Sequence, residues 1–541
     1  MGTACISKKN EVTINQKNKT IIPRKKKSKI TFKESNEIFE STINSFDLNS
    51  PQNNNKPSST QNKKINKMIV SLDSNVFITK SSQEPDLVYF REKILGSGSF
   101  GTVYLVKHRE LHKYFAMKVI QKNPHINEEN LLNEIALLKK MDHPNILKIL
   151  DFFSLKMEYN IITEFCQEGE LYNEIKAKAP FTEELSAYYI REILLAVHYC
   201  HNMKIVHRDL KPENILIVQR MKNGFHPIKI IDFGTAKVFS KTKKEHLLIG
   251  SAYYIAPEVL NKNYNEKCDL WSCGVILYIL LNGKVPFNGK NKNEILSNIQ
   301  KGEFDIENPH WKKISKSGKD LIYKLLEQNI SKRLNAEEAL EHNWFKENKS
   351  KELFTSIENK IIVDKLCNNL MNYKSNSVIQ ETALAYLVHN FNQTRNVINA
   401  CKLFCEIDED NDGKINEEEL YLGLSKKIKR KNLKSDCSKI FNNIDMNHNI
   451  YVEYEEFVRG AVNKEKFLSE NVLKFAYNYF DKDDNGEIDY QEIEMIFKDN
   501  IVDKNHIEEG LKKIIDEVDA NHDGKISFEE FCIVMKKMLV P

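Results

Sequence analysis

The sequence predicts an α+β fold in which a domain of strands and helices is followed by an all-α domain of repeated units. Short β-branched runs, such as Thr102 to Lys107, begin after Leu87, and helical patterns take over after Glu170. From about Asn396 the chain repeats every 36 to 38 residues, and each unit reads as a helix, an acidic loop and a helix. A period of this length indicates stacked supersecondary units.

Residues 1–85 are expected to be disordered. The segment is rich in Asn, Lys and Ser, and its 15 Lys and Arg against 7 Asp and Glu give it a net charge of about +8. Few apolar residues recur in it at any period, so it has little surface to bury in a core.

Bulk properties place the chain among ordinary globular proteins. Its 541 residues allow two or three domains, and 41% of them are hydrophobic and 29% charged. The net charge of +4 gives no reason to expect nucleic acid as a partner. We see neither a membrane span nor a secretory signal, so we expect the ten cysteines to be free thiols in a cytoplasmic protein.

A glycine-rich run and a lysine indicate a phosphate site. Gly96-x-Gly98-x-x-Gly101 follows one predicted strand, precedes another and leads into Val103. Glycines let the backbone close over phosphates, and the amide groups then face the anion. Fifteen residues after Val103, Lys118 is expected to contact the α and β phosphates, with Glu134 as its ion-pair partner.

A second group of residues has the spacing that phosphoryl transfer needs. In His207-Arg208-Asp209-Leu210-Lys211-Pro212-Glu213-Asn214, Asp209 is expected to orient a substrate hydroxyl and take its proton. Asn214 is expected to hold one Mg²⁺, and Asp232 of Asp232-Phe233-Gly234 to bridge metal and phosphates.

These motifs resemble the eukaryotic protein kinases over about residues 88–345, and Lys211 resembles the serine/threonine branch. The resemblance implies a bilobal protein-kinase fold that uses ATP. It makes Thr163 the gatekeeper, Glu258 and Arg333 a buried structural pair, and Asp269 the anchor of the catalytic loop. The implied nucleotide-binding residues are Leu95, Gly96, Gly98, Phe100, Gly101, Val103, Lys118, Glu134, Glu164 and Cys166.

The resemblance also bears on substrates and on control. Glu170 and Glu213 match positions where basophilic kinases hold a substrate arginine, although a third acidic position is Ile279 here. Alternatively, both glutamates serve helix packing. Leu247 stands where a regulatory phosphothreonine is usual, and Ser251 replaces a common threonine. Another input is therefore expected to set activity.

Four acidic loops have the spacing of the calcium-binding EF-hand, which places oxygen ligands around a sharp turn. Three of them fit at every key position, with Gly413, Gly486 and Gly524 at the turn. A solvated acidic loop is the alternative. The expected ligands of these three loops are Asp408, Asp410, Asp412, Lys414 and Glu419; Asp481, Asp483, Asn485, Glu487 and Glu492; and Asp519, Asn521, Asp523, Lys525 and Glu530.

The second loop departs from this pattern. Ile450 occupies the turn position, where a β-branched residue at positive φ is strained. The loop also carries fewer carboxylates. We expect it to bind weakly or to need its partner loop, through Asp445, Asn447, Asn449 and Glu456.

A kinase followed by four EF-hands resembles the calcium-dependent protein kinases of plants and protists, over residues 88–538. The resemblance implies that the connector, residues 346–395, blocks the active site at rest, and that calcium makes the EF-hand domain, residues 396–541, seize it. Ile362, Leu366 and Leu370 have the spacing of anchors for this exchange. The alternative is a connector helix packed permanently on one lobe.

The amino terminus is typical of acylation. Gly2 is a candidate for myristoylation and Cys5 for palmitoylation, with Arg24 to Lys27 attracting anionic lipid, although Ile6 stands where serine or threonine is preferred. An unmodified extension is the alternative. For the whole chain we expect a calcium-stimulated Ser/Thr kinase that is partly membrane-associated. A calcium-responsive scaffold with a catalytically weak kinase fold is the competing hypothesis.

Overall fold

The computed structural model describes residues 78, 80–81, 83–98, 101–122, 128–238, 251–306, 309–348, 357–374, 377–391, 394–445, 447, 449–497 and 507–539. All of these residues belong to one compact unit, Lys56–Pro541. The predictions for Gly2, Cys5 and Arg24 to Lys27, and those that concern Phe100 and Leu247, lie outside the described residues.

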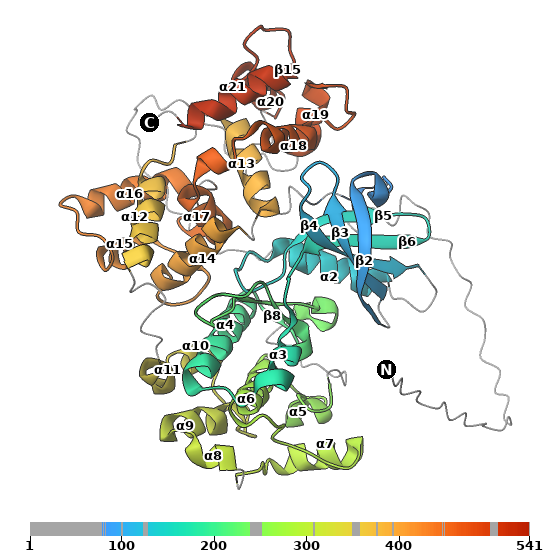
Figure 1. Cartoon of the computed structure of the whole chain (residues 1–541), viewed down its shortest axis with the longest axis vertical. Coiled ribbons are helices and arrows are strands. Elements are labelled where there is room, and N and C mark those ends of the chain that lie inside the picture. Colours follow the sequence, from blue (N-terminus) through green and yellow to red (C-terminus); the bar gives the residue numbers. More distant parts are fainter. Residues whose placement is uncertain are drawn as a thin grey trace, which may run out of the picture. The chain divides into compact units, whose positions relative to one another are not determined.

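A six-stranded sheet forms the amino-terminal lobe, in the strand order β1-β5-β6-β4-β3-β2. Strands β2 to β6 pair antiparallel, as the β-branched runs predict, and helix α2 packs against the sheet (Figure 1). Val106, Phe115, Met117 and Ile162 are at the centre of its core. The elements are β1 (Lys80–Ser81), β2 (Tyr89–Gly98), β3 (Gly101–His108), β4 (Tyr114–Gln121), α2 (Glu128–Lys140), β5 (Ile149–Ser154) and β6 (Glu158–Glu164).

Strand β1 extends the folded domain upstream of the predicted boundary at residue 88. Lys80 and Ser81 pair in parallel with Phe152 and Phe153 of β5, and Ile78 is buried. An edge strand leaves backbone N–H and C=O groups unpaired, and this short segment satisfies some of those on β5. Part of the segment that was predicted to be disordered is therefore ordered.

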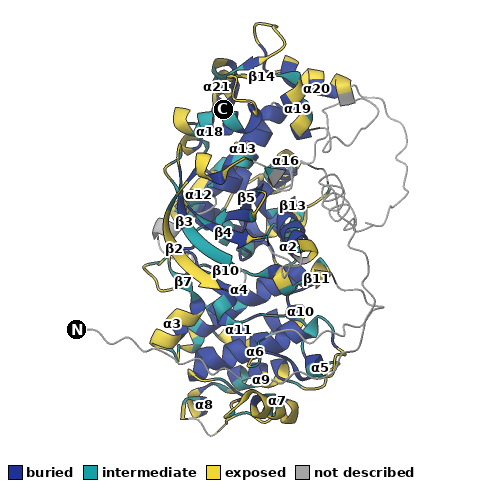
Figure 2. Ribbon diagram, turned by 90° about the vertical axis from the view of Figure 1, so that its right-hand side faces the viewer, coloured by how far each residue is buried: buried dark blue, intermediate teal, exposed yellow. Residues whose placement is uncertain are grey.

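The second lobe is helical and is built around α6, which is buried along its whole length from Cys268 (Figure 2). Gly274 permits this packing, because a Cβ there would lie 2.9 Å from both Leu325 Cβ and Leu326 Cδ2. The helices are α3 (Leu171–Lys178), α4 (Glu183–Asn202), α5 (Pro257–Leu260), α6 (Lys267–Asn282), α7 (Lys292–Lys301), α8 (Pro309–Lys313), α9 (Lys316–Leu325), α10 (Ala336–Leu340) and α11 (Asn343–Glu347).

Two small sheets hold the segments that carry the catalytic motifs. Strand β8 (Ile205–Val206) pairs with β11 (Lys237–Val238), and β9 (Ile215–Ile217) lies between β10 (Ile228–Ile230) and β7 (Gly169–Glu170). Residues 207–214 and 231–236 connect these strands. Both motif segments are thereby fixed at their ends by backbone pairing.

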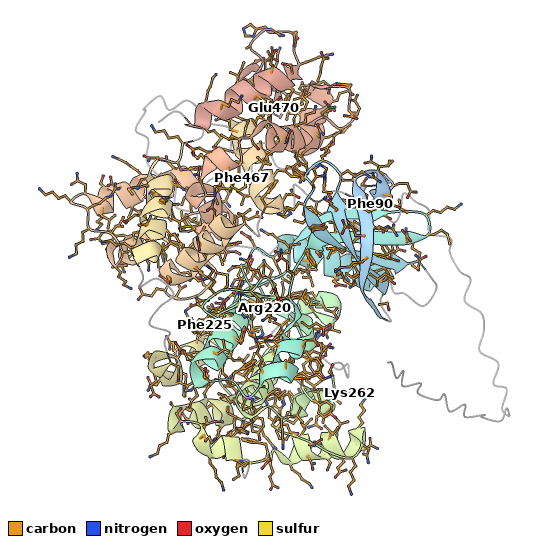
Figure 3. All side chains as sticks on the ribbon, in the orientation of Figure 1. Phe90, Arg220, Phe225, Lys262, Phe467 and Glu470 are labelled. Carbon is orange, nitrogen blue, oxygen red and sulfur yellow. The ribbon has the colours of Figure 1, made fainter. Side chains whose placement is uncertain are left out.

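The carboxyl-terminal region contains four helix–loop–helix units. Its loops pair through short antiparallel strands, β12 (Lys414–Ile415) with β13 (Val452–Glu453) and β14 (Glu487–Ile488) with β15 (Ile526–Ser527). Phe467 lies in the linker between the two pairs of units, and Glu470 begins the next helix, α18 (Figure 3). The helices are α14 (Arg395–Ile407), α15 (Glu417–Ser425), α16 (Leu433–Ile444), α17 (Tyr454–Ala461), α18 (Glu470–Phe480), α19 (Tyr490–Phe497), α20 (Ile507–Asp516) and α21 (Phe528–Lys536).

The connector helices α12 (Ile357–Met371) and α13 (Val378–Asn390) share the core of these units. Leu366 and Leu370 are buried in it, and Ile362 packs against it half-buried. Asn369 Nδ2 donates to the carbonyl of Ala461 at 2.8 Å, and Gln380 Nε2 donates to that of Val534 at 2.6 Å. The three predicted anchors therefore contact the EF-hand helices in this structure.

None of the helices in the described part of the chain is both long enough and apolar enough to cross a bilayer.

Candidate active site and calcium loops

Asp269, in the first turn of α6, anchors the catalytic loop. Its carboxylate accepts the backbone N–H groups of His207 and Arg208, each at 2.9 Å, and lies 3.0 Å from His201 Nε2. Burial alone would raise the pKa of Asp269, but the hydrogen bond and charge of His201, the charge of His207 and the Arg208 N–H together outweigh burial, and the pKa is lowered. This charged anchor lets Arg208 adopt a φ of 69°, which turns the chain toward Asp209.

Asp209 is positioned by three neighbours. Lys211 Nζ donates to its Oδ2 at 2.5 Å, and the Ser251 N–H and hydroxyl both donate to its Oδ1 at 2.9 Å. Asn214 Nδ2 donates to the backbone carbonyl of Asp209 at 2.9 Å, so the amide oxygen is the Asn214 atom that could contact the expected cation. Ser251 therefore helps to orient the catalytic carboxylate, a contact that its place in the sequence does not reveal.

Asp232 and Asn214 form the expected cation site. The N–H of Ile231, next to Asp232, donates to the carbonyl of Asn214 at 2.9 Å, which fixes the two segments together. Asp232 has a φ of 65°. Both residues offer the hard oxygen ligands that a divalent cation bridging phosphates requires.

Lys118 and Glu134 meet beside this site, with Nζ 3.7 Å from Oε1. Burial raises the pKa of Glu134; Lys118 opposes this effect and Asp232 adds to it. A Cβ on Gly234 would lie 3.2 Å from both the Asp232 and Glu134 carboxylates, so no larger residue fits between them without displacing one. The lysine, the glutamate and the two cation ligands are thus brought together as the sequence predicts.

The glycine-rich run closes the hairpin between β2 and β3, where Gly98 pairs with Gly101. Gly101 has a φ of 129°, and a Cβ there would lie 2.2 Å from the Val119 carbonyl oxygen. Val103 of β3 pairs with Lys118 of β4, so the glycine-rich run and Lys118 lie on adjacent strands. Leu95, Gly96 and Gly98 lie on the same hairpin.

The family resemblance makes Glu164 to Cys166, at the end of β6, the hinge that receives the adenine, and Glu164 and Cys166 are both buried. Glu164 Oε1 accepts the backbone N–H of Lys148 at 2.8 Å and lies 2.8 Å from Lys229 Nζ. Thr163 pairs with Ala116 of β4, which places the predicted gatekeeper at the back of the nucleotide site. Away from this site, Arg333 holds both oxygens of Glu258, at 2.5 and 2.9 Å.

Glu170 and Glu213 lie close enough for their charges to interact. Burial raises the pKa of Glu170, and the charge of Glu213 raises it further. Glu213 Oε2 is buried and has no hydrogen-bond partner among the described residues. Ile279, at the third position, is buried in α6. Two crowded carboxylates favour a cation from outside, such as a guanidinium.

The first calcium loop crowds its carboxylates in the same way. Oxygen atoms of Asp408, Asp410 and Asp412 lie within 4.8 Å of one another. Burial and the neighbouring charges raise the pKa of Asp408 to about 8 and that of Asp412 to about 6. Asp408 Oδ1 is buried and has no hydrogen-bond partner in the described structure. This orphaned oxygen, among like charges, fits a bound Ca²⁺.

The third and fourth loops have the same internal geometry. Glu492 Oε1 accepts the N–H of Lys482 at 2.6 Å, and Glu530 Oε1 accepts that of Ala520 at 3.0 Å, as Glu419 Oε1 accepts that of Glu409 at 3.1 Å. Oxygen atoms of Asp481, Asp483 and Glu492 also lie within 4.8 Å of one another. The remaining predicted ligands lie at equivalent loop positions: Lys414 in the first loop, Asn485 and Glu487 in the third, and Asp519, Asn521, Asp523 and Lys525 in the fourth.

The second loop keeps this geometry in spite of Ile450. The Ile450 N–H donates to Asp445 Oδ2 at 3.2 Å, as the Gly413 N–H donates to Asp408 Oδ2 at 3.1 Å. Its φ is 68°, against 85° for Gly413, and its side chain is 69% exposed. Asn449 donates to Asp445 and Asn447, and Glu456 accepts the N–H of Glu453. The second loop therefore keeps the geometry of the other turns at the cost of backbone strain at Ile450.

The fold and the site together define a protein kinase joined to two pairs of EF-hands. Comparison with family models gives the protein kinase domain over residues 89–345, and the EF-hand domain pair over residues 399–462 and 470–536. The chain is 37% identical to calcium-dependent protein kinase 4 of Plasmodium falciparum over 86% of this chain and 90% of that protein.

Two further relatives give the same result. Identity is 34% to calcium-dependent protein kinase 5 of Plasmodium falciparum (82% of this chain, 76% of the relative) and 35% to calcium-dependent protein kinase 3 of Plasmodium berghei (83% and 80%). The chain therefore belongs to the calcium-dependent protein kinase family. The predictions of a calcium-regulated protein kinase that uses ATP, a divalent metal and Ca²⁺, and acts on protein substrates, are confirmed.

Sequence reasoning missed a cluster of charges between the kinase and EF-hand regions. Lys148, just before β5, donates to Asp142 at 2.9 Å and to Glu455 of α17. His389 of α13 lies 2.9 Å from the same Glu455 oxygen. Lys148 and Glu455 are 307 residues apart, and no local pattern marks either of them.

Proposed function

We propose that the protein transfers the γ-phosphate of ATP to serine and threonine hydroxyls of proteins when Ca²⁺ fills its EF-hands. The observation that carries this proposal is the arrangement around Asp209, whose Oδ1 accepts from Ser251 and whose Oδ2 accepts from Lys211. Asp209 then accepts the proton of the substrate hydroxyl, and Lys118 contacts the phosphates.

Mg²⁺ is the metal that we assign to Asn214 and Asp232. When bound, it neutralises charge on the phosphates of ATP. The protein's own part is to hold the two ligands, through the backbone bond from Ile231 to Asn214, and to keep Lys118 beside them by the Glu134 contact.

Calcium acts, in this proposal, by relieving a block that the connector imposes at rest. The burial of Leu366 and Leu370 among the EF-hand helices supports this view, because a segment held there is withdrawn from any other site. A connector packed permanently in this way would leave activity insensitive to calcium. Kinase activity measured with and without calcium distinguishes a connector that calcium displaces from one that is permanently packed.

A substrate with a basic residue upstream of the acceptor is the finer proposal for specificity. The crowding of Glu170 and Glu213, and the unpartnered oxygen of Glu213, support it. Replacing that arginine in a peptide substrate by alanine should raise KM by about 10-fold or more, the loss of a charge-assisted contact. An unchanged KM would indicate that Glu170 and Glu213 serve helix packing and do not bind a substrate arginine.

For localisation, we propose a cytoplasmic protein that is partly held at membranes by acylation of Gly2 and Cys5. One acyl chain gives only marginal binding, so the second is needed for stable attachment. Gly2→Ala should move the protein to the soluble fraction of cells, and Cys5→Ser should do so in part. A distribution that neither change alters would contradict acylation.

The decisive test of the catalytic proposal is phosphate transfer to a peptide by full-length protein and by Asp209→Asn. Loss of the proton acceptor should lower the rate by about 10²–10⁴-fold. Calcium binding, measured by calorimetry, should be unchanged because Asp209 lies outside the loops. A variant that kept the wild-type rate would contradict the role of Asp209. Wild-type protein that transferred no phosphate above background would favour the scaffold hypothesis, for which no specific observation speaks.

A further inference from the structure

A buried group of four charged or polar side chains joins the second EF-hand to the nucleotide hinge. The group consists of Asp142, Lys148, His389 and Glu455. Lys148, His389 and Glu455 are 5%, 1% and 7% exposed, and the Asp142 side chain is 15% exposed. Asp142 and Lys148 belong to the kinase domain, His389 to the connector and Glu455 to α17. Three parts of the chain that are far apart in sequence therefore meet at one point.

Glu455 is the centre of this group. Lys148 Nζ donates to its carboxylate, and His389 Nδ1 lies 2.9 Å from the same oxygen. Its backbone N–H donates to Asp142 Oδ2 at 2.8 Å. Because both its backbone and its side chain contact the kinase domain, the start of α17 is fixed there in position and in orientation.

The group continues into the hinge that receives the adenine. The backbone N–H of Lys148 donates to Glu164 Oε1 at 2.8 Å, and the Glu164 N–H donates back to the Lys148 carbonyl at 3.3 Å. Residue 148 is thus held by Glu455 through its side chain and holds the hinge residue through its backbone. His389 Nε2 adds a contact to the carbonyl of Ile149, one residue further on, at 3.0 Å.

The same start of α17 belongs to the second calcium loop. Glu455 immediately precedes Glu456, the last expected ligand of that loop, whose Oε2 accepts the N–H of Glu453 at 3.0 Å. A cation that draws in Glu456 fixes the first turn of α17, and hence the direction in which Glu455 leaves the helix. The loop with the strained turn is therefore linked to the hinge through Glu455 and Lys148.

We propose that Glu455 is a positioning residue for ATP, which acts through Lys148 on the hinge at Glu164 and makes nucleotide affinity depend on the second EF-hand. This inference rests on the proposed function, and it adds to it a second effect of calcium. Relief of a block changes access of the protein substrate and kcat, whereas this contact changes the affinity for ATP. By linkage, bound nucleotide then raises calcium affinity by the same factor.

The test measures kcat and KM for ATP in full-length protein at saturating calcium, for Glu455→Gln, Lys148→Met and the double variant. Glu455→Gln keeps the shape of the side chain and removes its charge. KM for ATP should rise by about 3- to 10-fold with kcat within about twofold, in line with couplings carried by such networks. The double variant should be no worse than the poorer single variant, since both break one contact.

Glu110→Gln is the matched control. Asn478 of α18 donates to the Glu110 carboxylate at 3.1 and 3.3 Å, so this carboxylate also joins the kinase and EF-hand regions, but it has no described contact with the hinge. KM for ATP should stay at the wild-type value in this variant. An equal rise in Glu110→Gln and Glu455→Gln would overturn the inference, because general loosening of the interface would explain both.

A measurement on unaltered protein covers the case in which Glu455→Gln folds poorly. Binding of an ATP analogue, followed by fluorescence with calcium and with chelator, should be about 3- to 10-fold tighter with calcium. An affinity that calcium does not change, while kcat still rises with calcium, overturns the inference and leaves the proposed function standing. A kcat that does not depend on calcium contradicts the proposed function itself.

Discussion

The catalytic cleft and the first calcium loop both gather carboxylates, and they balance the charge differently. In the cleft, Asp209 accepts from Lys211 at 2.5 Å and Glu134 lies 3.7 Å from Lys118. In the loop, burial and neighbouring carboxylates raise the pKa of Asp408 to about 8 and that of Asp412 to about 6, and Lys414 only partly opposes the shift at Asp412. In the catalytic cleft, lysine side chains of the protein balance the carboxylates. In the calcium loop, a cation from solution has to balance them.

This difference indicates where an outside signal enters. The cleft is assembled by internal ion pairs, so its catalytic groups are in place before any ligand binds. The loop holds like charges together at a cost that an added cation removes. Calcium therefore changes the free energy of the EF-hand region far more than that of the cleft, and the contacts between the two regions carry the change across.

Removing the last ligand of a loop should give the largest effect. In Glu419→Gln we expect the calcium affinity of the first loop to fall by about 10- to 100-fold, because the substitution removes the bidentate carboxylate. Glu456→Gln in the second loop should cost less, since that loop begins with fewer carboxylates and a strained turn. Calorimetric titration of each variant gives the two losses. Equal losses would mean that the two loops bind alike.

Two turn glycines separate strain within a loop from contact with the kinase domain. Gly413 and Gly524 have nearly equal φ values, 85° and 84°, but only at Gly413 would a Cβ meet Tyr199 of α4, at 2.5 Å from Cδ2. Both alanine variants should lose about 1–2 kcal/mol of loop stability from the backbone.

Gly413→Ala should lose about 1–3 kcal/mol more from the clash and should show lower kinase activity at saturating calcium. Gly524→Ala should reach full activity once its loop is filled. Thermal unfolding and initial rates measure the two quantities. If both variants behaved alike, the first loop would not rest on α4 in the active protein.

The raised pKa of Asp408 predicts how pH acts on the calcium-free protein. The folded state holds this proton up to about pH 8, whereas an unfolded Asp releases it near pH 4. Between these values the folded state binds more protons, so its stability falls as pH rises.

We expect the EF-hand region to lose on the order of 1–2 kcal/mol between pH 6 and pH 8 without calcium. With calcium bound the trend should disappear, because the proton is replaced by the metal. Melting temperatures at the two pH values, with calcium and with chelator, measure this. A calcium-free protein that is more stable at pH 8 would contradict the crowding.

The smallest expected effect is at Ile450. Its φ of 68° is one that β-branched residues avoid, so Ile450→Gly should stabilise the second loop by about 1 kcal/mol and tighten calcium binding there by a few fold. The exposed side chain makes little packing that could be lost. Unchanged affinity would show that loop entropy in the glycine variant cancels the relief of strain.

Much of this site could be predicted from the sequence, because its chemistry needs fixed residue types at fixed spacing. Asp209, Asn214 and Asp232 fall within 24 positions, and each calcium loop within 12. The turn strain at Ile450 was also predictable, because the equivalent position in each of the other three loops is a glycine.

Long-range contacts were not predictable in the same way. Lys148 pairs with a residue 307 positions away, and β1 is two residues long with no alternation of its own. The carboxylate of Glu455 looks, in sequence, like one more acidic residue of an EF-hand loop. Only its burial against Lys148 and His389 distinguishes it.

The most direct test of the account is a calcium titration of full-length protein in which loop occupancy and the rate of peptide phosphorylation are followed together. We predict that the rate rises in step with occupancy and returns to its low value when a chelator removes the metal. Filled loops with a rate equal to that of the calcium-free protein would contradict the claim that the EF-hand region controls the cleft.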